Sequence, residues 1–199
     1  MKFIGITGGV GAGKSAILEY IASHYNAKVM LADEIAHDLM MPGSECYDTI
    51  KRVFGKEDIF LSDGSFDRIK MAQVIFSNET KREQMNGIVH PAVREYILEV
   101  YEKEKKEGTL DFLILEAALL IEEHYDEICD ELWYIYTSEK NRRERLKENR
   151  GYSDEKIDGI FASQLTEEEY RRHCVKVIDN NGSVEDTMLQ LVKIFDEEK

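Results

Sequence analysis

The chain has 199 residues, with 26 basic side chains against 40 acidic ones and a net charge of −14 at pH 7. This length predicts one domain, with room for a lid or a small insertion and for a large buried core. Nucleic acids and membrane surfaces bind to basic faces, so the charge argues against both as partners. An anionic ligand would need clustered Lys or Arg, or a metal ion, to offset the acidic field.

The first predicted element is an apolar strand over residues 2–7. It leads into Gly8-Gly9-Val10-Gly11-Ala12-Gly13-Lys14-Ser15, which fits the phosphate-binding pattern G-x-x-x-x-G-K-[ST], and helical apolar spacing follows. In this context the loop backbone and the helix amino end cradle phosphates, Lys14 reaches the β- and γ-phosphates, and Ser15 ligates Mg²⁺. We therefore predict a bound nucleoside triphosphate rather than a glycine-rich turn without a ligand. The residues of this loop predicted to contact ATP are Gly9, Gly11, Ala12, Gly13, Lys14, Ser15 and Ala16.

Later apolar runs predict further strands over residues 28–31, 111–116, 131–137 and 174–178. They are apolar nearly throughout, as parallel strands are when both faces of their sheet are covered. Because they alternate with helical segments, right-handed crossovers and a three-layer α/β fold with a five-stranded parallel sheet are expected. Ligands in such folds bind beyond the carboxyl ends of the strands.

The long segment between the second and third strands reads as a helical insertion over residues 34–109, interrupted by a turn at Ser62-Asp63-Gly64-Ser65. Its helices are predicted over residues 34–41, 45–54, 66–77, 79–88 and 91–107. An insertion at this place is where a small-molecule kinase would house its acceptor, although plain helical packing accounts for most of these residues. The core would then comprise residues 1–33, 110–137 and 173–199.

Residues 138–172 are highly charged and rich in arginine. Ser153 and Thr166 are predicted N-caps, and Thr166-x-x-Glu169 fits a capping box. We predict a helical hairpin that closes over the nucleotide as a lid. The alternative is a solvated helix pair with intrahelical ion pairs. The arginines of this lid region are Arg142, Arg143, Arg145, Arg150, Arg171 and Arg172.

Two carboxylates end predicted strands. Asp33 follows the second strand and is the candidate base that orients an acceptor hydroxyl and takes its proton, although it could also cap a helix beginning at Glu34. Glu116 ends the third strand. It is predicted either to hold Mg²⁺ or its water shell, or only to cap the following helix.

With these residues in place, the chain resembles the dephospho-CoA kinase family over almost its full length. The resemblance rests on motifs in order: Thr7 to Ser15, Ala32-Asp33-Glu34-Ile35-Ala36-His37, Val89-His90-Pro91-Ala92-Val93-Arg94, Glu116-Ala117-Ala118-Leu119-Leu120-Ile121-Glu122, Arg145-Leu146, Gln164-Leu165 and Val177-Ile178-Asp179-Asn180-Asn181-Gly182. A phosphate-binding loop alone is common to many nucleotide-binding proteins, whereas the Ala-Asp, His-Pro and Ile-Asp-Asn elements together are far more discriminating.

The resemblance implies ATP-dependent phosphorylation of the ribose 3′-hydroxyl of dephospho-CoA, which gives CoA and ADP in the last step of coenzyme A biosynthesis. By position, Asp33 would be the base, Lys14 the phosphate-stabilising cation and Ser15 the Mg²⁺ ligand. Thr7 would lie near the phosphates, and a turn at His90-Pro91 would help to form the acceptor region.

In the lid region, Arg145 matches the family and would be the catalytic arginine that contacts ATP. The chain departs from the family where Asn149 and Ile160 stand at positions that are often arginine, so Arg142 or Arg150 could compensate. Ala118 replaces a usual proline, which loosens a loop without removing a chemical group.

Three widely spaced cysteines with no C-x-x-C pair favour reduced thiols in a cytoplasmic protein. No signal peptide and no run of membrane-spanning length is recognisable. A monomer or a weak homo-oligomer is expected. The competing interpretations are a kinase of another small metabolite and a nucleotide-dependent switch, although the guanine-reading N-K-x-D element of a GTPase is absent from the sequence.

Overall fold

The computed structural model describes residues 1–198, which form two compact units. The first, called the core unit, consists of Met1–Met30 and the chain from Glu107 onward. The second, called the helical unit, is Leu31–Lys106. Each unit is described by itself.

The core unit is built on a parallel sheet in the order β2-β3-β1-β4-β5. Strand β1 is central and pairs in parallel with β3 and β4, and β4 pairs in parallel with β5. The predicted five-stranded parallel sheet is therefore confirmed, and the glycine-rich loop leaves its middle strand. The strands are β1 (Lys2–Thr7), β2 (Ala27–Leu31), β3 (Phe112–Glu116), β4 (Glu131–Tyr136) and β5 (Lys176–Asp179).

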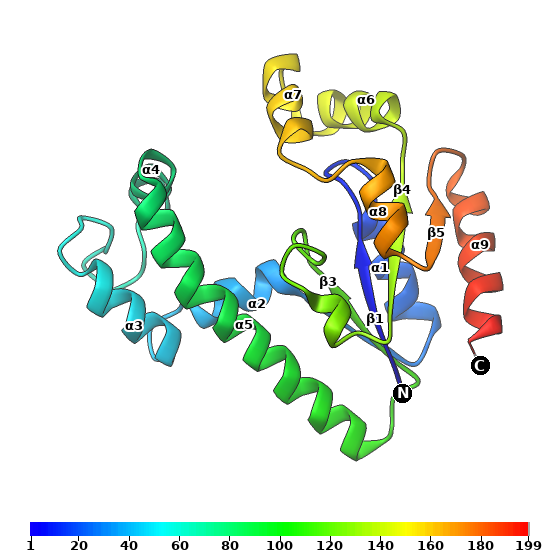
Figure 1. Cartoon of the computed structure of the whole chain (residues 1–199), viewed down its shortest axis with the longest axis horizontal. Coiled ribbons are helices and arrows are strands. Elements are labelled where there is room, and N and C mark those ends of the chain that lie inside the picture. Colours follow the sequence, from blue (N-terminus) through cyan, green and yellow to red (C-terminus); the bar gives the residue numbers. More distant parts are fainter. Residues whose placement is uncertain (199) are drawn as a thin grey trace. The chain divides into compact units, whose positions relative to one another are not determined.

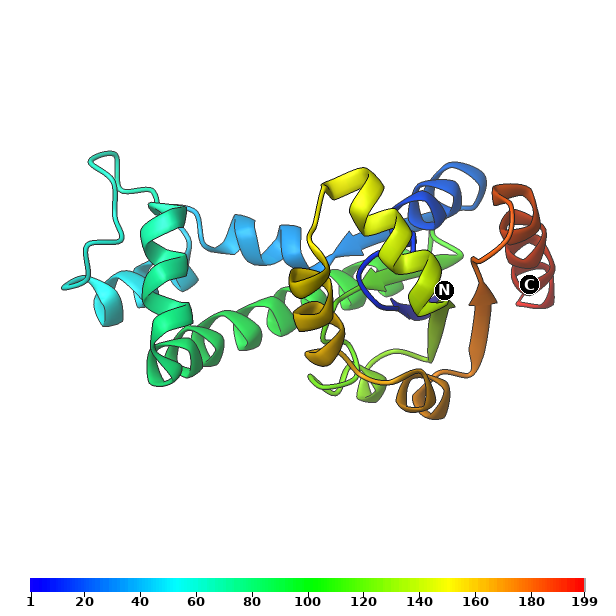
Figure 2. The same cartoon turned by 90° about the horizontal axis from the view of Figure 1, so that it is seen from above.

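Helices cover both faces of the sheet (Figures 1 and 2). Helices α1 (Lys14–His24) and α9 (Val184–Glu197) lie on one face, and α8 (Glu167–His173) lies on the other. Phe195 of α9 lies edge-on to Trp133 of β4, with ring centroids 5.1 Å apart, while the next residue, Tyr134, stacks on Tyr170 of α8 at 4.7 Å. The side chains of successive β4 residues thus pack against helices on opposite faces of the sheet, as the alternation of side chains along a strand requires.

The lid region forms α6 (Glu139–Arg150) and α7 (Asp154–Ala162) before α8. The predicted caps are confirmed: Ser153 accepts a hydrogen bond from a backbone N–H of α7, and Thr166 and Glu169 form the capping box of α8. Arg143 of α6 makes ion pairs with Asp154 and Asp158 of α7, at 2.9 and 2.5 Å. Arg143 also makes the expected kind of intrahelical ion pair, with Glu139 at 3.4 Å, so its ion pairs lie both within α6 and between α6 and α7.

The helical unit contains α2 (Ala32–Leu39), α3 (Glu45–Phe54), α4 (Arg68–Ser77) and α5 (Glu79–Glu107). The predicted turn is confirmed, because Gly64 N–H donates to the carbonyl of Leu61 and Gly64 has a left-handed φ of 86°. Helix α2 begins at Ala32 with Leu31 as its N-cap, so the expectation that Asp33 caps a helix starting at Glu34 is wrong.

Helix α5 also corrects a prediction. It runs unbroken for 29 residues with Pro91 inside it, so the two helices expected over 79–88 and 91–107 are one, and His90-Pro91 is not a turn. Figure 1 shows its continuous ribbon. The proline removes one backbone hydrogen bond. A buried stripe at four-residue spacing continues across it and offsets that loss, through Met85, Val89, Val93 and Ile97.

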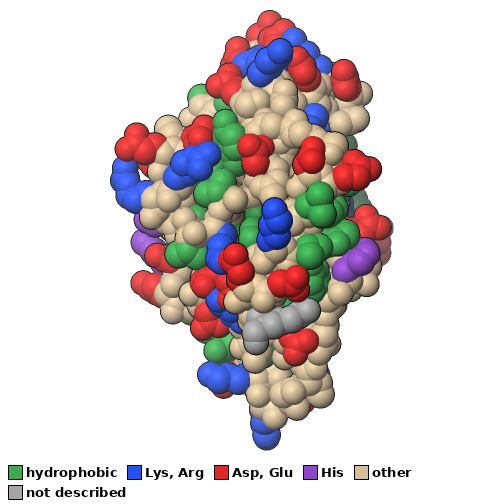
Figure 3. Space-filling model, turned by 90° about the vertical axis from the view of Figure 1, so that its right-hand side faces the viewer, with side chains coloured by type: hydrophobic (Ala, Val, Ile, Leu, Met, Phe, Trp, Pro, Cys, Tyr) green, Lys and Arg blue, Asp and Glu red, His purple; other side chains and the backbone are tan. Residues whose placement is uncertain are grey.

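The surface agrees with the composition. On the face shown in Figure 3, acidic and basic side chains are interspersed rather than gathered into one basic area. Within residues 1–198, no helix combines the length and the apolar character needed to cross a membrane.

Candidate nucleotide site

The loop between β1 and α1 has the backbone of an anion cradle. Gly11 and Gly13 have left-handed φ angles of 85° and 87°, which side chains other than glycine rarely adopt. Ala12 N–H closes the loop by donating to the carbonyl of Gly9 at 3.0 Å. Helix α1 begins at Lys14, so its unsatisfied N–H groups and the positive end of its dipole lie at the loop. This arrangement favours a bound phosphate.

Lys14 supplies a cation at the loop. Its Nζ donates to the carbonyl of Gly8 at 2.7 Å and lies 3.4 Å from Glu116 Oε1 at the carboxyl end of β3. Both side chains are mostly buried, with 15% and 16% of their surface exposed. The structure thus brings together two residues predicted from distant motifs. Ser15 and Ala16 follow in the first turn of α1 and are exposed.

Thr7 lies at the end of β1 and is 1% exposed. Its hydroxyl oxygen is the buried side-chain atom that lacks a hydrogen-bond partner among the described residues. Buried hydroxyls are nearly always paired, so this oxygen indicates a place for a water molecule or a ligand atom.

The carbonyl of Ala12 accepts hydrogen bonds from three donors. Asn180 Nδ2 donates to it at 2.7 Å, Thr137 Oγ1 at 3.0 Å and Arg145 Nη1 at 3.4 Å. Arg145 also donates to the carbonyl of Asn180 at 2.7 Å. The loops after β4 and β5 therefore fix the shape of the phosphate-binding loop. Reasoning from the sequence did not single out Thr137 or Asn180 as contacts, although the Ile-Asp-Asn motif was the signal that could have found the latter.

Arg142 lies at the other side of the loop. Its Nε donates to the carbonyl of Val10 at 2.9 Å, and its Nη2 donates to Oε1 of Gln164. The same Gln164 oxygen accepts from Val10 N–H at 3.3 Å, so this residue of the loop is bound through both its backbone N–H and its carbonyl. Because a Cβ on Gly9 would overlap the Arg142 guanidinium, the missing side chain of Gly9 makes room for this arrangement.

The remaining arginines of the lid region that form ion pairs do so away from the loop. Arg143 meets the carboxylates of α7 described above, and Arg171 and Arg172 pair with Glu167 and Glu168 one turn earlier on α8. Of the lid-region arginines, Arg142 and Arg145 are therefore the two that contact the loop.

Two predicted site residues belong to the helical unit. Asp33 is an exposed residue in the first turn of α2, directly after the carboxyl end of β2. His90 lies in the middle of α5 and is partly buried.

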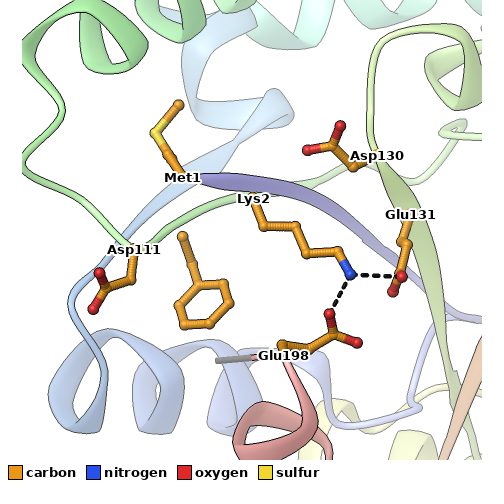
Figure 4. Close-up of a pocket in the computed structure, with 7 residues that line it drawn as sticks. Met1, Lys2, Asp111, Asp130, Glu131 and Glu198 are labelled. Atoms are coloured by element: carbon orange, nitrogen blue, oxygen red, sulfur yellow. Dashed lines mark hydrogen bonds and ion pairs between the residues drawn. The ribbon is translucent and has the colours of Figure 1, made fainter.

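A hollow of about 690 Å³ lies elsewhere, at the amino ends of β1, β3 and β4 (Figure 4). Lys2 stands within it and is already bound by the carboxylates of Glu131, at 2.6 Å, and Glu198. Asp111 and Asp130 add further negative charge. Ligands of parallel α/β sheets bind at the opposite, carboxyl ends, and an anion would be repelled here, so this hollow is not the nucleotide site.

The central strand, glycine-rich loop, lysine and helix amino end together define a P-loop nucleotide-binding protein of the α/β class. Among known proteins, the family model for dephospho-CoA kinase matches residues 2–186. The chain belongs to the dephospho-CoA kinase family. A curated dephospho-CoA kinase of Symbiobacterium thermophilum is 33% identical over 191 residues, covering 96% of this chain and 79% of the relative.

Solved structures agree with this assignment. The dephospho-CoA kinase from Campylobacter jejuni superposes with a TM-score of 0.73 and 25% identity, covering 99% of this chain and 97% of that one. The shikimate kinase from Acinetobacter baumannii, at a TM-score of 0.52 and 14% identity over 100% of this chain and 95% of that one, shares the fold alone. The predicted P-loop kinase fold is therefore confirmed.

Proposed function

We propose that this chain transfers the γ-phosphoryl group of ATP to the ribose 3′-hydroxyl of dephospho-CoA, which yields CoA and ADP. The observation that carries the proposal is a family match spanning residues 2–186 together with an anion cradle at the centre of the sheet. The match includes the segments that carry Lys14, Asp33, His90 and Arg145.

ATP binds with its phosphates along the loop. Backbone N–H groups and Lys14 meet the phosphate oxygens, and Arg145, already in contact with the Ala12 carbonyl, binds ATP from the lid region. Thr7, with its unpartnered buried hydroxyl, contributes a hydrogen bond near the phosphates. The proposed ATP-binding residues are Gly9, Gly11, Ala12, Gly13, Lys14, Ser15, Ala16 and Arg145.

Mg²⁺ fits the donors at this loop. Ser15 offers an exposed hydroxyl next to Lys14, and Glu116 offers a carboxylate close to the same lysine. Mg²⁺ keeps several waters and is commonly held by one or two protein oxygens together with substrate phosphates, so this small donor set suits it. When bound, the ion neutralises charge on the β- and γ-phosphates.

Asp33 is the proposed general base. Its carboxylate is exposed in the first turn after β2, and it accepts the proton of the 3′-hydroxyl as that oxygen attacks phosphorus. His90 is proposed to contact dephospho-CoA from α5. A cytoplasmic location and a monomeric or weakly associated state stay predictions.

The direct test is an ADP-release assay with ATP, Mg²⁺ and dephospho-CoA, with the product identified by mass spectrometry. We expect ADP formation that requires dephospho-CoA and yields a 3′-phosphorylated product. Nucleoside monophosphates and sugar acids, tested as acceptors beside it, detect a kinase of another metabolite. ADP release that is independent of every acceptor, or that follows another acceptor, would refute the proposal.

A further inference from the structure

Arg142 and Arg145, on the same side of α6, both lie against the P-loop, and neither forms an ion pair with a carboxylate within the described part of the chain. This is unusual in a chain of net charge −14, where other arginines of the lid region pair with Asp or Glu. A partly buried cation that lacks an ion pair carries a desolvation cost, and attraction to an arriving anion offsets that cost. Both side chains are therefore suited to meet the triphosphate.

The two guanidinium groups hold different parts of the loop. Arg145 lies next to the amino end of α1. Its Nη1 donates to the Ala12 carbonyl and to Thr137 Oγ1, and its Nη2 donates to the carbonyl of Asn180 in the loop after β5. Arg142 reaches Val10, on the side of the loop that follows β1. Its Nη1 has no hydrogen-bond partner among residues 1–198, so this group is free to donate to a ligand.

The surroundings of Arg142 orient it without an ion pair, although the carboxylate of Glu139 on the same helix favours its charged form electrostatically. The ring of Phe161 lies 4.3 Å from its Cζ, and Gln164 binds its Nη2. Burial raises the pKa of both Tyr134 and Tyr170 to about 12, so neither phenol supplies a negative charge near neutral pH. Burial also lowers the pKa of Arg142, although a guanidinium stays charged.

We propose that Arg142 is a further catalytic residue, which donates through its free Nη1 to the transferring phosphoryl group, while Arg145 binds ATP in the ground state. This assignment rests on the proposed function. As the acceptor oxygen bonds to the γ-phosphorus, the bond from phosphorus to the β–γ bridging oxygen breaks, and ADP leaves with that electron pair. The hydroxyl proton passes to Asp33. Arg142 is unchanged and stabilises charge on the oxygens in transfer, as an arginine supplied to a phosphoryl-transfer site does.

The test compares Arg142→Gln and Arg145→Gln with Arg172→Gln, an exposed arginine of α8 whose loss removes the same charge away from the loop. Three quantities are measured: turnover, the Kd of MgATP, and the affinity for MgADP with and without aluminium fluoride, a mimic of the transferring group. The last two need no acceptor. These two affinities therefore test the role of Arg142 independently of the acceptor. If the parent protein did not phosphorylate dephospho-CoA, that result would refute the proposed function alone.

For Arg142→Gln we expect kcat to fall by about 10²–10³-fold, with a smaller rise of about 2- to 12-fold in the MgATP Kd, because the variant also loses the hydrogen bond to the Val10 carbonyl. The extra affinity conferred by aluminium fluoride should be lost. Arg145→Gln should instead weaken MgATP binding, and Arg172→Gln should resemble the parent. An Arg142→Gln protein that keeps the fluoride effect, or whose loss lies wholly in ATP affinity, would overturn the assignment.

Gly9→Ala provides an independent check, because its Cβ would displace the Arg142 guanidinium while the rest of the loop keeps its sequence. If both changes act through this guanidinium, the double variant should be no worse than the poorer single variant. Multiplicative losses of kcat would contradict the proposal. Thermal unfolding of each variant identifies any that fails to fold, and Arg142→Lys, which keeps the charge without the fork geometry, then serves as the replacement.

Discussion

Replacing Asn180 by Ala tests whether the loop after β5 holds the P-loop in its binding shape. The change removes the 2.7 Å hydrogen bond from Asn180 Nδ2 to the Ala12 carbonyl and the bond that Thr187 donates to Asn180 Oδ1 at 2.9 Å. Thr137 still donates to the Ala12 carbonyl, and the Thr187 hydroxyl still reaches the carbonyl of Ser183 at 3.2 Å, so no buried group is orphaned. At about 0.5–1.5 kcal/mol for each of the two net hydrogen bonds, the expected destabilisation is about 1–3 kcal/mol.

The part of this cost that comes from the bond to Ala12 should also appear in nucleotide binding, because ATP must then order a loop that the parent protein presents already ordered. At about 0.5–1.5 kcal/mol for that bond and about 1.4 kcal/mol for a tenfold change, the Kd of MgATP should rise by about 2- to 12-fold. Urea unfolding gives the first quantity and calorimetric titration the second. Asn149→Ala, an exposed change on α6, is the matched control. Parental stability and parental ATP affinity in the Asn180 variant would refute the reasoning.

Three further predictions follow from other parts of the molecule. Asp33→Asn should fold and bind MgATP but lose about 10²–10⁴-fold in kcat, and near-parental turnover would remove it as the base. Phe195→Ala should lower the free energy of unfolding by about 3–5 kcal/mol in urea, since this ring fills the layer between α9 and the sheet and is fully buried; a loss under about 1 kcal/mol would contradict the described packing. Stability should fall at alkaline pH, because burial raises the pKa of Tyr134, Tyr170 and Cys174 to about 12 in the folded state. The unfolded chain then loses these protons first, so the contribution is present below about pH 9 and is lost as the pH rises towards 12. Melting temperatures between pH 8 and 11 check this, and Tyr170→Phe should flatten the profile.

Several features could be predicted from local pattern alone. Strands β1 and β4 and helix α3 lie within a residue of their predicted bounds. The two strands are nearly continuous apolar runs, and the apolar residues of α3 repeat with the period of a helix. The P-loop needs its glycines and lysine in one short run, so it is visible without any tertiary contact. The prediction from local pattern was wrong for helix α5, because Pro91 predicted a break that does not occur. The burial of Met85 and Val93 on either side of the proline outweighs the one backbone hydrogen bond that is lost.

By itself, the sequence therefore determined the strands of the sheet, the phosphate-binding loop and the resemblance to a kinase family, because each depends on short runs of contiguous residues. Only the tertiary structure decided which side chains meet that loop. Thr137, Arg142 and Asn180 come from segments more than 120 residues away from it in the chain, and they converge because β4 and β5 lie on one side of β1 in a parallel sheet. The order of the strands and the geometry of the crossovers decide which of these side chains reach the loop, and the spacing of residues along the chain does not reveal either.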